Sequence, residues 1–229
     1  MKDPKRFAIV AALPREVRLL TGAVSADPTL LARGIHLHRL ASSVVVTAGM
    51  GAVRASLAFE AALATGPLDT VISVGLAGSC SPALLPGTIA EASLVIDPRT
   101  GERFTTASPV PGTVLATTAA IASVGEKARL AASYGAAMVD MEAATLARLA
   151  AAHGIPFSAI KGVSDAHDFE LASMSRFEGK HGQFRTAAFA LHTALRPHHW
   201  RPAARLGRES NRALAALHLR LQEILAESN

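Results

Sequence analysis

Three carboxylates in the sequence follow apolar, strand-like runs. Glu16 comes after FAIVAAL, Glu142 comes after AAMVDM, and Asp165 closes IPFSAIKGVSD. Carboxylates at such points can act as general acids or bases, or can accept hydrogen bonds from sugar hydroxyls. The alternative is that each is a helix-start carboxylate facing the positive end of a helix dipole, and for Glu16 alone we favour that alternative.

Two glycine-containing segments also follow strand-like runs. TAGMGAV opens a helix, and SVGLAGSCSPALLPG ends a buried strand. In open α/β sheets ligands bind at the carboxyl ends of the strands, where helix-start amides can meet a polar ligand. Five strand ends therefore carry a carboxylate or a glycine turn. This joint placement favours one shared active site over unrelated helix caps.

Other chemistries have weaker support in the sequence. His36 and His38 alternate on a strand, and neither this pair nor the later His-His pair has a third ligand at metal spacing. Gly49-x-Gly51 lacks the third glycine of a dinucleotide fingerprint, and no Walker lysine or G-x-S-x-G motif is present. We therefore expect neither a metal nor a cofactor.

The elements that must position these residues alternate between strands and helices. Strands are expected over 6–12, 35–40, 43–48, 69–75, 88–97, 136–141 and 156–165. Helices are expected over 14–21, 49–64, 125–134 and 185–195, with another ending at residue 153 and a loop over 98–112. This alternation predicts an α/β fold of three layers, with a largely parallel sheet between two layers of helices.

Composition places the protein in a broad class. Half of the residues are hydrophobic, so the chain can bury a sizeable core. Cys80 is the only cysteine, which suits a reducing compartment, and the first apolar run is too short for a signal peptide. We therefore predict a cytoplasmic location. The basic residues lack interleaved aromatics, so we do not expect nucleic acid as a partner.

The C-terminal residues differ from the rest. Residues 176–229 hold nine basic and four acidic side chains, which accounts for the whole net charge of +5. We divide the chain into an α/β domain, 1–196, and a basic amphipathic helical extension, 197–229. The apolar face of this helix is expected to dock on its own domain or on a partner subunit, and peripheral contact with a membrane is the alternative.

VDMEAA, together with KGVSDAHD, resembles the paired signature of the purine nucleosidase and phosphorylase superfamily. The closest pattern is that of 5'-methylthioadenosine/S-adenosylhomocysteine nucleosidases. AALPREV resembles that family's first strand with its catalytic glutamate, and AGMGAVRA and SVGLAGSCSPALLPGTI resemble its two glycine turns. The resemblance covers residues 6–166. It implies a nucleoside phosphorylase-like three-layer α/β/α sandwich with a mixed, largely parallel central sheet.

The resemblance also implies a role for each candidate residue. Asp165 would be the general acid that protonates N7 of adenine, oriented by Ser164, and Glu16 would orient the attacking water. Glu142 would accept hydrogen bonds from the ribose hydroxyls and stabilise an oxocarbenium-like transition state, while Met141 would pack on the sugar. The expected substrate-binding set is completed by Met50, Ala77, Gly78 and Lys161.

Some residues around this expected site bear on the nucleophile and the base. Phosphorylases of the superfamily hold phosphate with arginines and a serine near the strand-end glycines. Here Ser73 and Leu76 stand at the relevant places, which favours water, although Lys161 remains available to neutralise an anion. Asp140 is expected to be structural, and Phe104 and residues 121–124 are candidates for contacting adenine.

The function implied is a cofactor-free nucleosidase that releases adenine from a 5'-methylthioadenosine or S-adenosylhomocysteine type of substrate. A purine nucleoside phosphorylase is the first alternative. The C-terminal segment resembles the hopanoid-associated branch of the superfamily, so the second alternative is an enzyme that releases adenine from a lipid-linked adenosyl group. A non-enzymatic nucleoside-binding module is a third. The resemblance also implies a homodimer.

Overall fold

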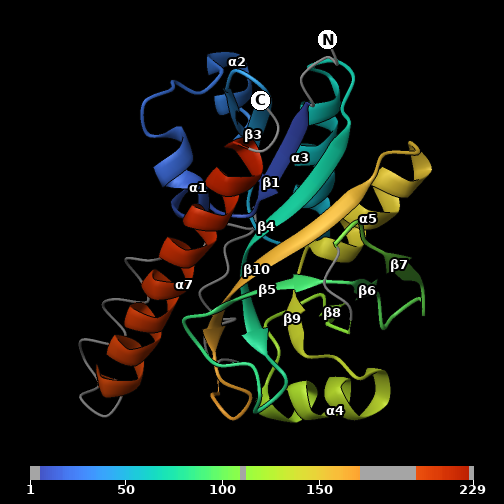
Figure 1. The fold of residues 1–229 in the computed structure, drawn as a ribbon, viewed down its shortest axis with the longest axis vertical. Coiled ribbons are helices and arrows are strands. Elements are labelled where there is room, and N and C mark those ends of the chain that lie inside the picture. Colours follow the sequence, from blue (N-terminus) through green and yellow to red (C-terminus); the bar gives the residue numbers. More distant parts are fainter. Residues whose placement is uncertain (1–5, 109–111, 171–199, 227–229) are drawn as a thin grey trace.

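The computed structural model describes residues 6–108, 112–170 and 200–226, with only the backbone described over 200–202. A ten-stranded sheet forms the centre of the molecule (Figure 1). Its main path is β2-β3-β1-β4-β9-β8-β6-β7, and β10 pairs with both β4 and β5. The strands are β1 (Phe7–Ala11), β2 (His36–Arg39), β3 (Ser43–Thr47), β4 (Thr70–Ser79), β5 (Ile89–Ala92), β6 (Leu94–Ile96), β7 (Arg103–Thr105), β8 (Val114–Thr117), β9 (Met138–Asp140) and β10 (Phe157–Asp165).

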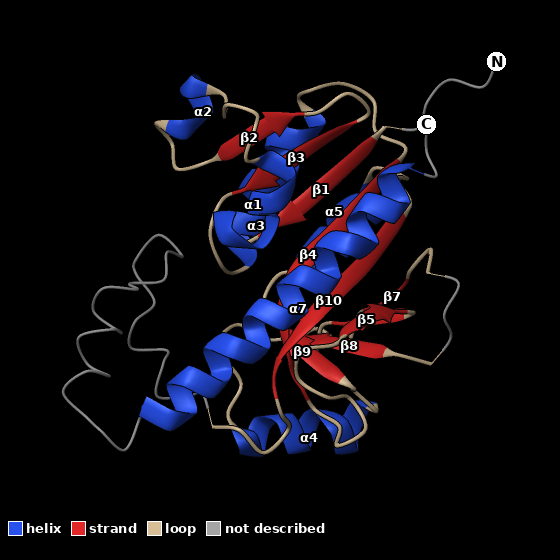
Figure 2. Cartoon of the chain, turned by 60° about the vertical axis from the view of Figure 1, so that its left-hand side comes forward, coloured by secondary structure: helices blue, strands red, loops and turns tan. Residues whose placement is uncertain are grey.

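Helices cover both faces of this sheet (Figure 2). They are α1 (Pro14–Thr21), α2 (Pro28–Leu31), α3 (Ala52–Leu63), α4 (Val124–Tyr134), α5 (Ala143–Ala152) and α7 (Trp200–Ala226). Alternate residues of β1 enter two separate cores: Phe7 and Ile9 face α1 and α7, whereas Ala8 and Val10 face α3 and α5. Because both faces are covered, the strand is apolar throughout, as predicted. The three-layer α/β sandwich with a mixed, largely parallel sheet is confirmed.

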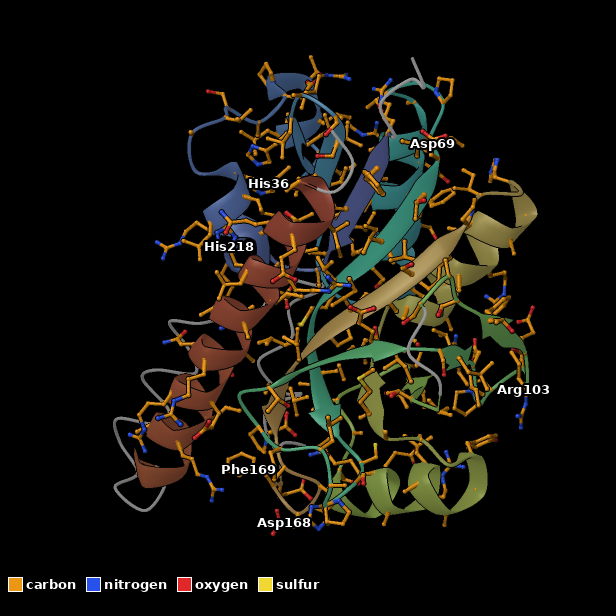
Figure 3. The ribbon with its side chains drawn as sticks, in the orientation of Figure 1. His36, Asp69, Arg103, Asp168, Phe169 and His218 are labelled. Atoms are coloured by element: carbon orange, nitrogen blue, oxygen red, sulfur yellow. The ribbon has the colours of Figure 1, made fainter. Side chains whose placement is uncertain are left out.

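The sheet brings several strand ends to one edge. β1 runs parallel to β3 and β4, and β4 runs parallel to β10, so their carboxyl ends lie on the same side. After β10 the chain makes a tight turn beside α4, in which the Phe169 amide donates to the carbonyl of Ala166 at 3.1 Å (Figure 3). This turn places residues 166–169 next to the site described below.

Several predicted boundaries need correction. The strand expected over 88–97 is two strands, β5 and β6, and the loop expected over 98–112 contains β7. β4 was expected to end at residue 75 but continues to Ser79, because Gly75 adopts a φ of 129° and lets the strand bend instead of stopping. β8 and α2 were not predicted. The helix expected over 185–195 lies outside the described residues.

The C-terminal helix α7 packs along β10, β4 and α1. Leu217 and Leu221 are fully buried in the same core as the first strand, so the apolar face of the helix contacts its own domain. Within the described part of the chain, no helix has both the length and the apolar character needed to cross a bilayer. The predicted domain boundary at residue 197 falls outside the described residues and stays a prediction.

Gly162 of β10 lies close against α7. A Cβ atom at this position would lie 3.0 Å from the Cβ and 3.1 Å from the carbonyl oxygen of Ala213. We expect Gly162→Ala to push α7 away from the sheet and to lower the free energy of unfolding by roughly 1–3 kcal/mol. Urea denaturation measures this change.

Gly125 of α4 provides the matched control. The nearest atom to a Cβ there is Ser123 Oγ at 3.9 Å, so Gly125→Ala has room and should leave stability unchanged or raise it by up to about 1 kcal/mol. Equal stability of the Gly162→Ala protein and the wild type would show that α7 does not pack tightly on β10.

Candidate active site

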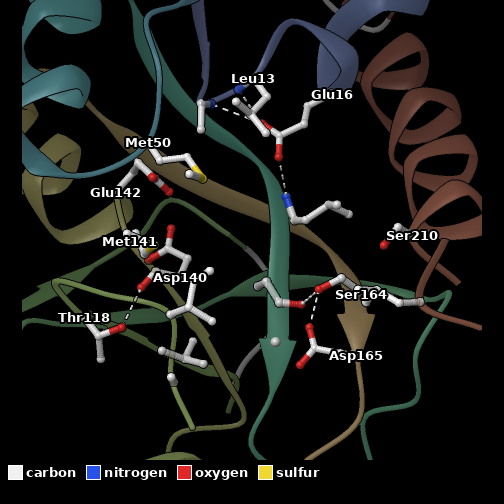
Figure 4. A pocket seen from close by; sticks show the side chains of 18 of the residues that line it. Leu13, Glu16, Met50, Thr118, Asp140, Met141, Glu142, Ser164, Asp165 and Ser210 are labelled. Carbon is white, nitrogen blue, oxygen red and sulfur yellow. Dashed lines mark hydrogen bonds between the residues drawn. The ribbon is translucent and has the colours of Figure 1, made fainter. Parts of the chain in front are cut away.

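A cavity of about 340 Å³ opens at the edge of the sheet where β1, β4 and β10 end (Figure 4). This volume lies at the lower end of the range for small-molecule sites. Among the predicted residues, those that line it are Glu16, Met50, Ala77, Gly78, Met141, Glu142, Ser164 and Asp165. Segments that are far apart in the sequence thus meet in a single site. Lys161 does not line this cavity.

Asp165 is buried at the end of β10, with 3% of its surface exposed. Ser164 Oγ contacts both Asp165 Oδ1 and the carbonyl oxygen of Ala77, the latter at 3.1 Å. A hydroxyl has one hydrogen. The Ser164 hydroxyl therefore donates either to Asp165 Oδ1 or to the carbonyl oxygen of Ala77, and its contact with Oδ1 positions the carboxyl group.

Burial raises the pKa of Asp165 above its usual range. The ammonium of Lys127 and the hydroxyl of Ser164 act in the opposite direction without reversing the shift. Lys127 of α4 forms a buried ion pair with Asp165 Oδ2 and also lines the cavity. The site therefore contains a carboxyl group whose surroundings favour a retained proton, as a general acid requires.

Glu142 lies between the starts of two helices. It precedes α5, and its Oε1 accepts a hydrogen bond from the Gly51 amide at the start of α3, at 2.8 Å. Burial and the neighbouring Asp140 raise the pKa of Glu142 to about 7, although Lys161 and the Gly51 amide lower it in part. The amide in the first glycine turn thus binds this carboxylate, whereas the sequence suggested a contact with the ligand.

Asp140 and Lys161 form a second buried pair next to Glu142. The Lys161 ammonium lies 3.0 Å from Asp140 Oδ2 and donates to Ser73 Oγ at 2.9 Å, and its side chain is 1% exposed. Thr117 donates to the other oxygen of Asp140 at 2.7 Å. These contacts explain why Lys161 is kept out of the cavity, and they agree with a structural role for Asp140.

Glu16 combines a helix-start position with a place in the cavity wall. Its Oε2 accepts hydrogen bonds from the amides of Ala12 and Leu13 at 3.1 and 2.9 Å, and Oε1 accepts one from Leu76 at 3.2 Å. Gly75 leaves the necessary space, because a Cβ there would lie 3.0 Å from Glu16 Oε2. A carboxylate has about four lone-pair sites, so one remains free to accept from a bound water.

The remaining wall has two parts that the sequence only partly indicated. Thr118, Ala120, Ile121 and Ala122 come from the segment before α4, and of these only Ile121 and Ala122 belong to the range 121–124 that was a candidate for contacting the base. The opposite part is formed by α7, through Ala203, Leu206, Gly207, Ser210 and Asn211. Phe104, the other candidate for the base, packs against the core instead.

No sequence motif pointed to Lys127. The only available signal was its position one helical turn before the buried Leu130, which places a charged side chain on the apolar face of α4. Across the described residues, no group of three or more His, Cys, Asp or Glu side chains is arranged to hold a metal ion. The polar side chains that line the cavity are carboxyl groups, hydroxyls, the Asn211 amide and the cations of Arg15 and Lys127.

Solved structures with the same fold include two from Helicobacter pylori. Futalosine hydrolase of strain 26695 gives a TM-score of 0.67 at 17% identity, over 96% of this chain and 98% of that one. 5'-Methylthioadenosine/S-adenosylhomocysteine nucleosidase with butyl-thio-DADMe-Immucillin-A gives 0.67 at 15% identity, over 97% and 100%. S-adenosylhomocysteine nucleosidase from Streptococcus pyogenes gives 0.59 at 19% identity, over 76% and 89%.

A search of curated protein sequences returned no significant match. The family model of the Phosphorylase superfamily matches residues 6–110 and 102–195. These two matches cover more than half of the chain and include every residue of the candidate site outside α7. The chain belongs to the Phosphorylase superfamily.

Proposed function

We propose that this protein hydrolyses the N-glycosidic bond of an adenine nucleoside of the 5'-methylthioadenosine or S-adenosylhomocysteine type. The observation that carries the proposal is the meeting of Asp165, Glu142 and Glu16 in one cavity, with the pKa of Asp165 raised by burial. A protonated carboxyl and an ionisable carboxylate in one site are the pair that glycosidic cleavage needs.

In this mechanism Asp165 gives its proton to N7 of the base as the bond between C1' and N9 breaks. The bonding electrons go to the base, which leaves in neutral form, and positive charge develops on the ribose. The Glu142 carboxylate stabilises that charge and binds the sugar hydroxyls. A water that donates to Glu16 attacks C1' from the other face and gives its proton to the Glu16 carboxylate, which completes the hydrolysis.

The cations near the cavity support water rather than phosphate as the nucleophile. Arg54 donates to the backbone carbonyls of Ala48 and Gly34, and it is not among the lining residues. The Lys127 ammonium donates to Asp165 and two carbonyls. Among the described lining residues, Arg15 is then the one cation without such a partner, and its side chain is exposed. A phosphate ion needs more donors than this.

We expect the purified protein to release adenine from methylthioadenosine and S-adenosylhomocysteine in phosphate-free buffer. Chromatography of the products, with and without added phosphate, measures both the rate and the fate of the sugar. Added phosphate should not raise the rate, and the product should be a free sugar. Strict dependence on phosphate, with a sugar 1-phosphate as product, would identify a phosphorylase.

Adenosine and futalosine belong in the same assay, since a futalosine hydrolase shares this fold. Release of base from futalosine alone would support the proposed hydrolysis but show that the substrate is futalosine and not an adenine nucleoside. If no base is released from any of the four compounds, the next substrate to assay is a lipid-linked adenosyl compound. Binding of adenine without turnover of any of these would support the non-enzymatic alternative. The homodimer stays a prediction that light scattering tests.

A further inference from the structure

Lys127 is a buried lysine at a place in the fold that disfavours a positive charge. It lies in the first turn of α4, where the helix dipole repels a cation, and 1% of its surface is exposed. Burying an ammonium is costly unless it is paired and fully hydrogen-bonded. The repulsion by the helix dipole and the cost of burial must therefore both be offset by the groups that Lys127 contacts.

The contacts of Lys127 use the whole ammonium group. Its Nζ pairs with Asp165 Oδ2, and it donates to the carbonyl oxygens of Ala166 and Phe169 at 2.9 and 3.1 Å. An ammonium has three hydrogens, so none is left for a ligand. Lys127 therefore acts on the candidate acid and on the turn that follows β10, and does not bind a substrate directly.

Gly78 of β4 makes room for this arrangement. A Cβ there would lie 3.0 Å from Asp165 Oδ2 and 3.2 Å from Lys127 Cε, which is closer than most Cβ contacts in proteins. In the second glycine segment, the missing side chain of Gly78 thus allows the Asp165 carboxyl and the Lys127 ammonium to come into contact beside β4. Three elements, α4, β4 and β10, converge on the contact between the Lys127 ammonium and the Asp165 carboxyl group.

We propose that Lys127 is a positioning residue that stabilises the carboxylate form of Asp165 as this residue gives its proton to the leaving base. The proposal rests on the function proposed above. Before the transfer Asp165 is a neutral carboxyl beside an ammonium; afterwards the proton is on N7 and the ammonium faces a carboxylate. Lys127 keeps its own three hydrogens throughout. Burial alone would make Asp165 a weak acid, and the adjacent positive charge makes it a stronger one.

The other titratable groups near Asp165 do not supply the positive charge that Lys127 provides. Glu126 of α4 is paired with Arg129 on the surface, and the Cys80 thiol beyond β4 stays neutral because burial raises its pKa to about 12. His167 and Asp168 lie in the following turn, where His167 is partly exposed and Asp168 is exposed. The described residues of α7 that line the cavity are uncharged.

The test compares Lys127→Met with the wild type in the pH dependence of adenine release. Activity on the basic side is lost as Asp165 loses its proton, so removal of the ammonium should move this limb upward by about 1–3 pH units. Near neutral pH, kcat should fall by about 10-fold or more, within the range that general acid catalysis contributes. Arg129→Met removes an exposed cation from the same helix and should leave the limb in place.

A second substrate separates this role from a structural one. 4-Nitrophenyl riboside has a leaving group that departs without protonation, so Lys127→Met should hydrolyse it at nearly the wild-type rate. Lys127→Arg should restore much of the activity on the nucleoside. Equal loss on both substrates with an unmoved basic limb would show that Lys127 is only structural and would overturn the proposal.

Two further measurements keep the test independent of folding and of the assay. If Lys127→Met does not fold, Lys127→Gln removes the charge while its amide can still donate to the carbonyls of Ala166 and Phe169. The ¹³C NMR titration of the Asp165 carboxyl, assigned with Asp165→Asn, gives its pKa without any substrate. An unchanged Asp165 pKa in the lysine variant would refute the inference, whereas an inactive wild type would refute only the proposed function.

Discussion

Asp165→Asn will release base at least about 100-fold more slowly than the wild type, because a carboxamide can donate a hydrogen bond but cannot give up a proton. The substitution keeps the size of the side chain, so the variant should still fold and bind nucleoside. The residual rate should also lose the basic limb of the pH profile. Initial rates of base release between pH 5 and pH 9 measure both effects.

Asp168→Asn is the matched control for this substitution. Asp168 is exposed and lies in the turn that follows β10, so the same chemical change is made close by without contact with the cavity. Its activity should equal that of the wild type. If Asp165→Asn retained more than a tenth of the wild-type rate, Asp165 would not be the proton donor.

Glu142→Gln will lower activity and raise stability at the same time. The pKa of Glu142 is raised by burial from 4.5 to about 7, so its ionised form is disfavoured in the folded protein. That same ionised form is the one that stabilises positive charge on the sugar. We expect a loss of about 100-fold in kcat/KM, since glutamine can bind a hydroxyl but carries no charge.

The effect on stability has a definite dependence on pH. The folded protein holds the Glu142 proton up to about pH 7, whereas the unfolded chain releases it near 4.5. The free energy of unfolding of the wild type therefore falls as the pH rises through this window, and above the window the whole loss is present. The Glu142 side chain lines the cavity, which reduces the cost of its charge. We therefore expect Glu142→Gln to be more stable than the wild type by roughly 1–3 kcal/mol at pH 8, and equally stable near pH 4.

Urea unfolding at the two pH values measures this difference. Glu60→Gln makes the same change at an exposed position of α3 and should show no dependence of this kind. A Glu142→Gln protein that is less stable than the wild type at pH 8 would mean that the carboxylate is well solvated or paired in the folded state, contrary to the raised pKa.

The sequence predicted the long, strongly patterned elements well. α1 has the expected bounds, and β1, β3 and β10 agree to within a residue because each is a continuous apolar run bounded by turn residues. Short elements such as β7 and β8 were missed, since three or four residues give too little periodicity to recognise. The path of β4 depended on a single glycine whose conformation only the folded environment decides.

The candidate site divides in a similar way. Residues at strand ends, such as Glu142 and Asp165, could be predicted because parallel strands must end at the same edge. Lys127 could not, because its contact with Asp165 joins positions 38 residues apart through packing of α4. The use of Glu16 and Lys161 also depends on partners that a linear pattern does not reveal, namely three amides for the first and Asp140 for the second.

The participation of α7 in the cavity has a consequence for the chain as it is synthesised. When a ribosome has made residues up to Asp165, all three carboxylates are present, but Leu206, Ser210 and the rest of the α7 wall are not. The face of β1 and β10 that Leu217 and Leu221 cover is then open to water. A nascent or truncated chain without α7 is therefore expected to be inactive and to bind chaperones, so that catalysis begins only after α7 has docked.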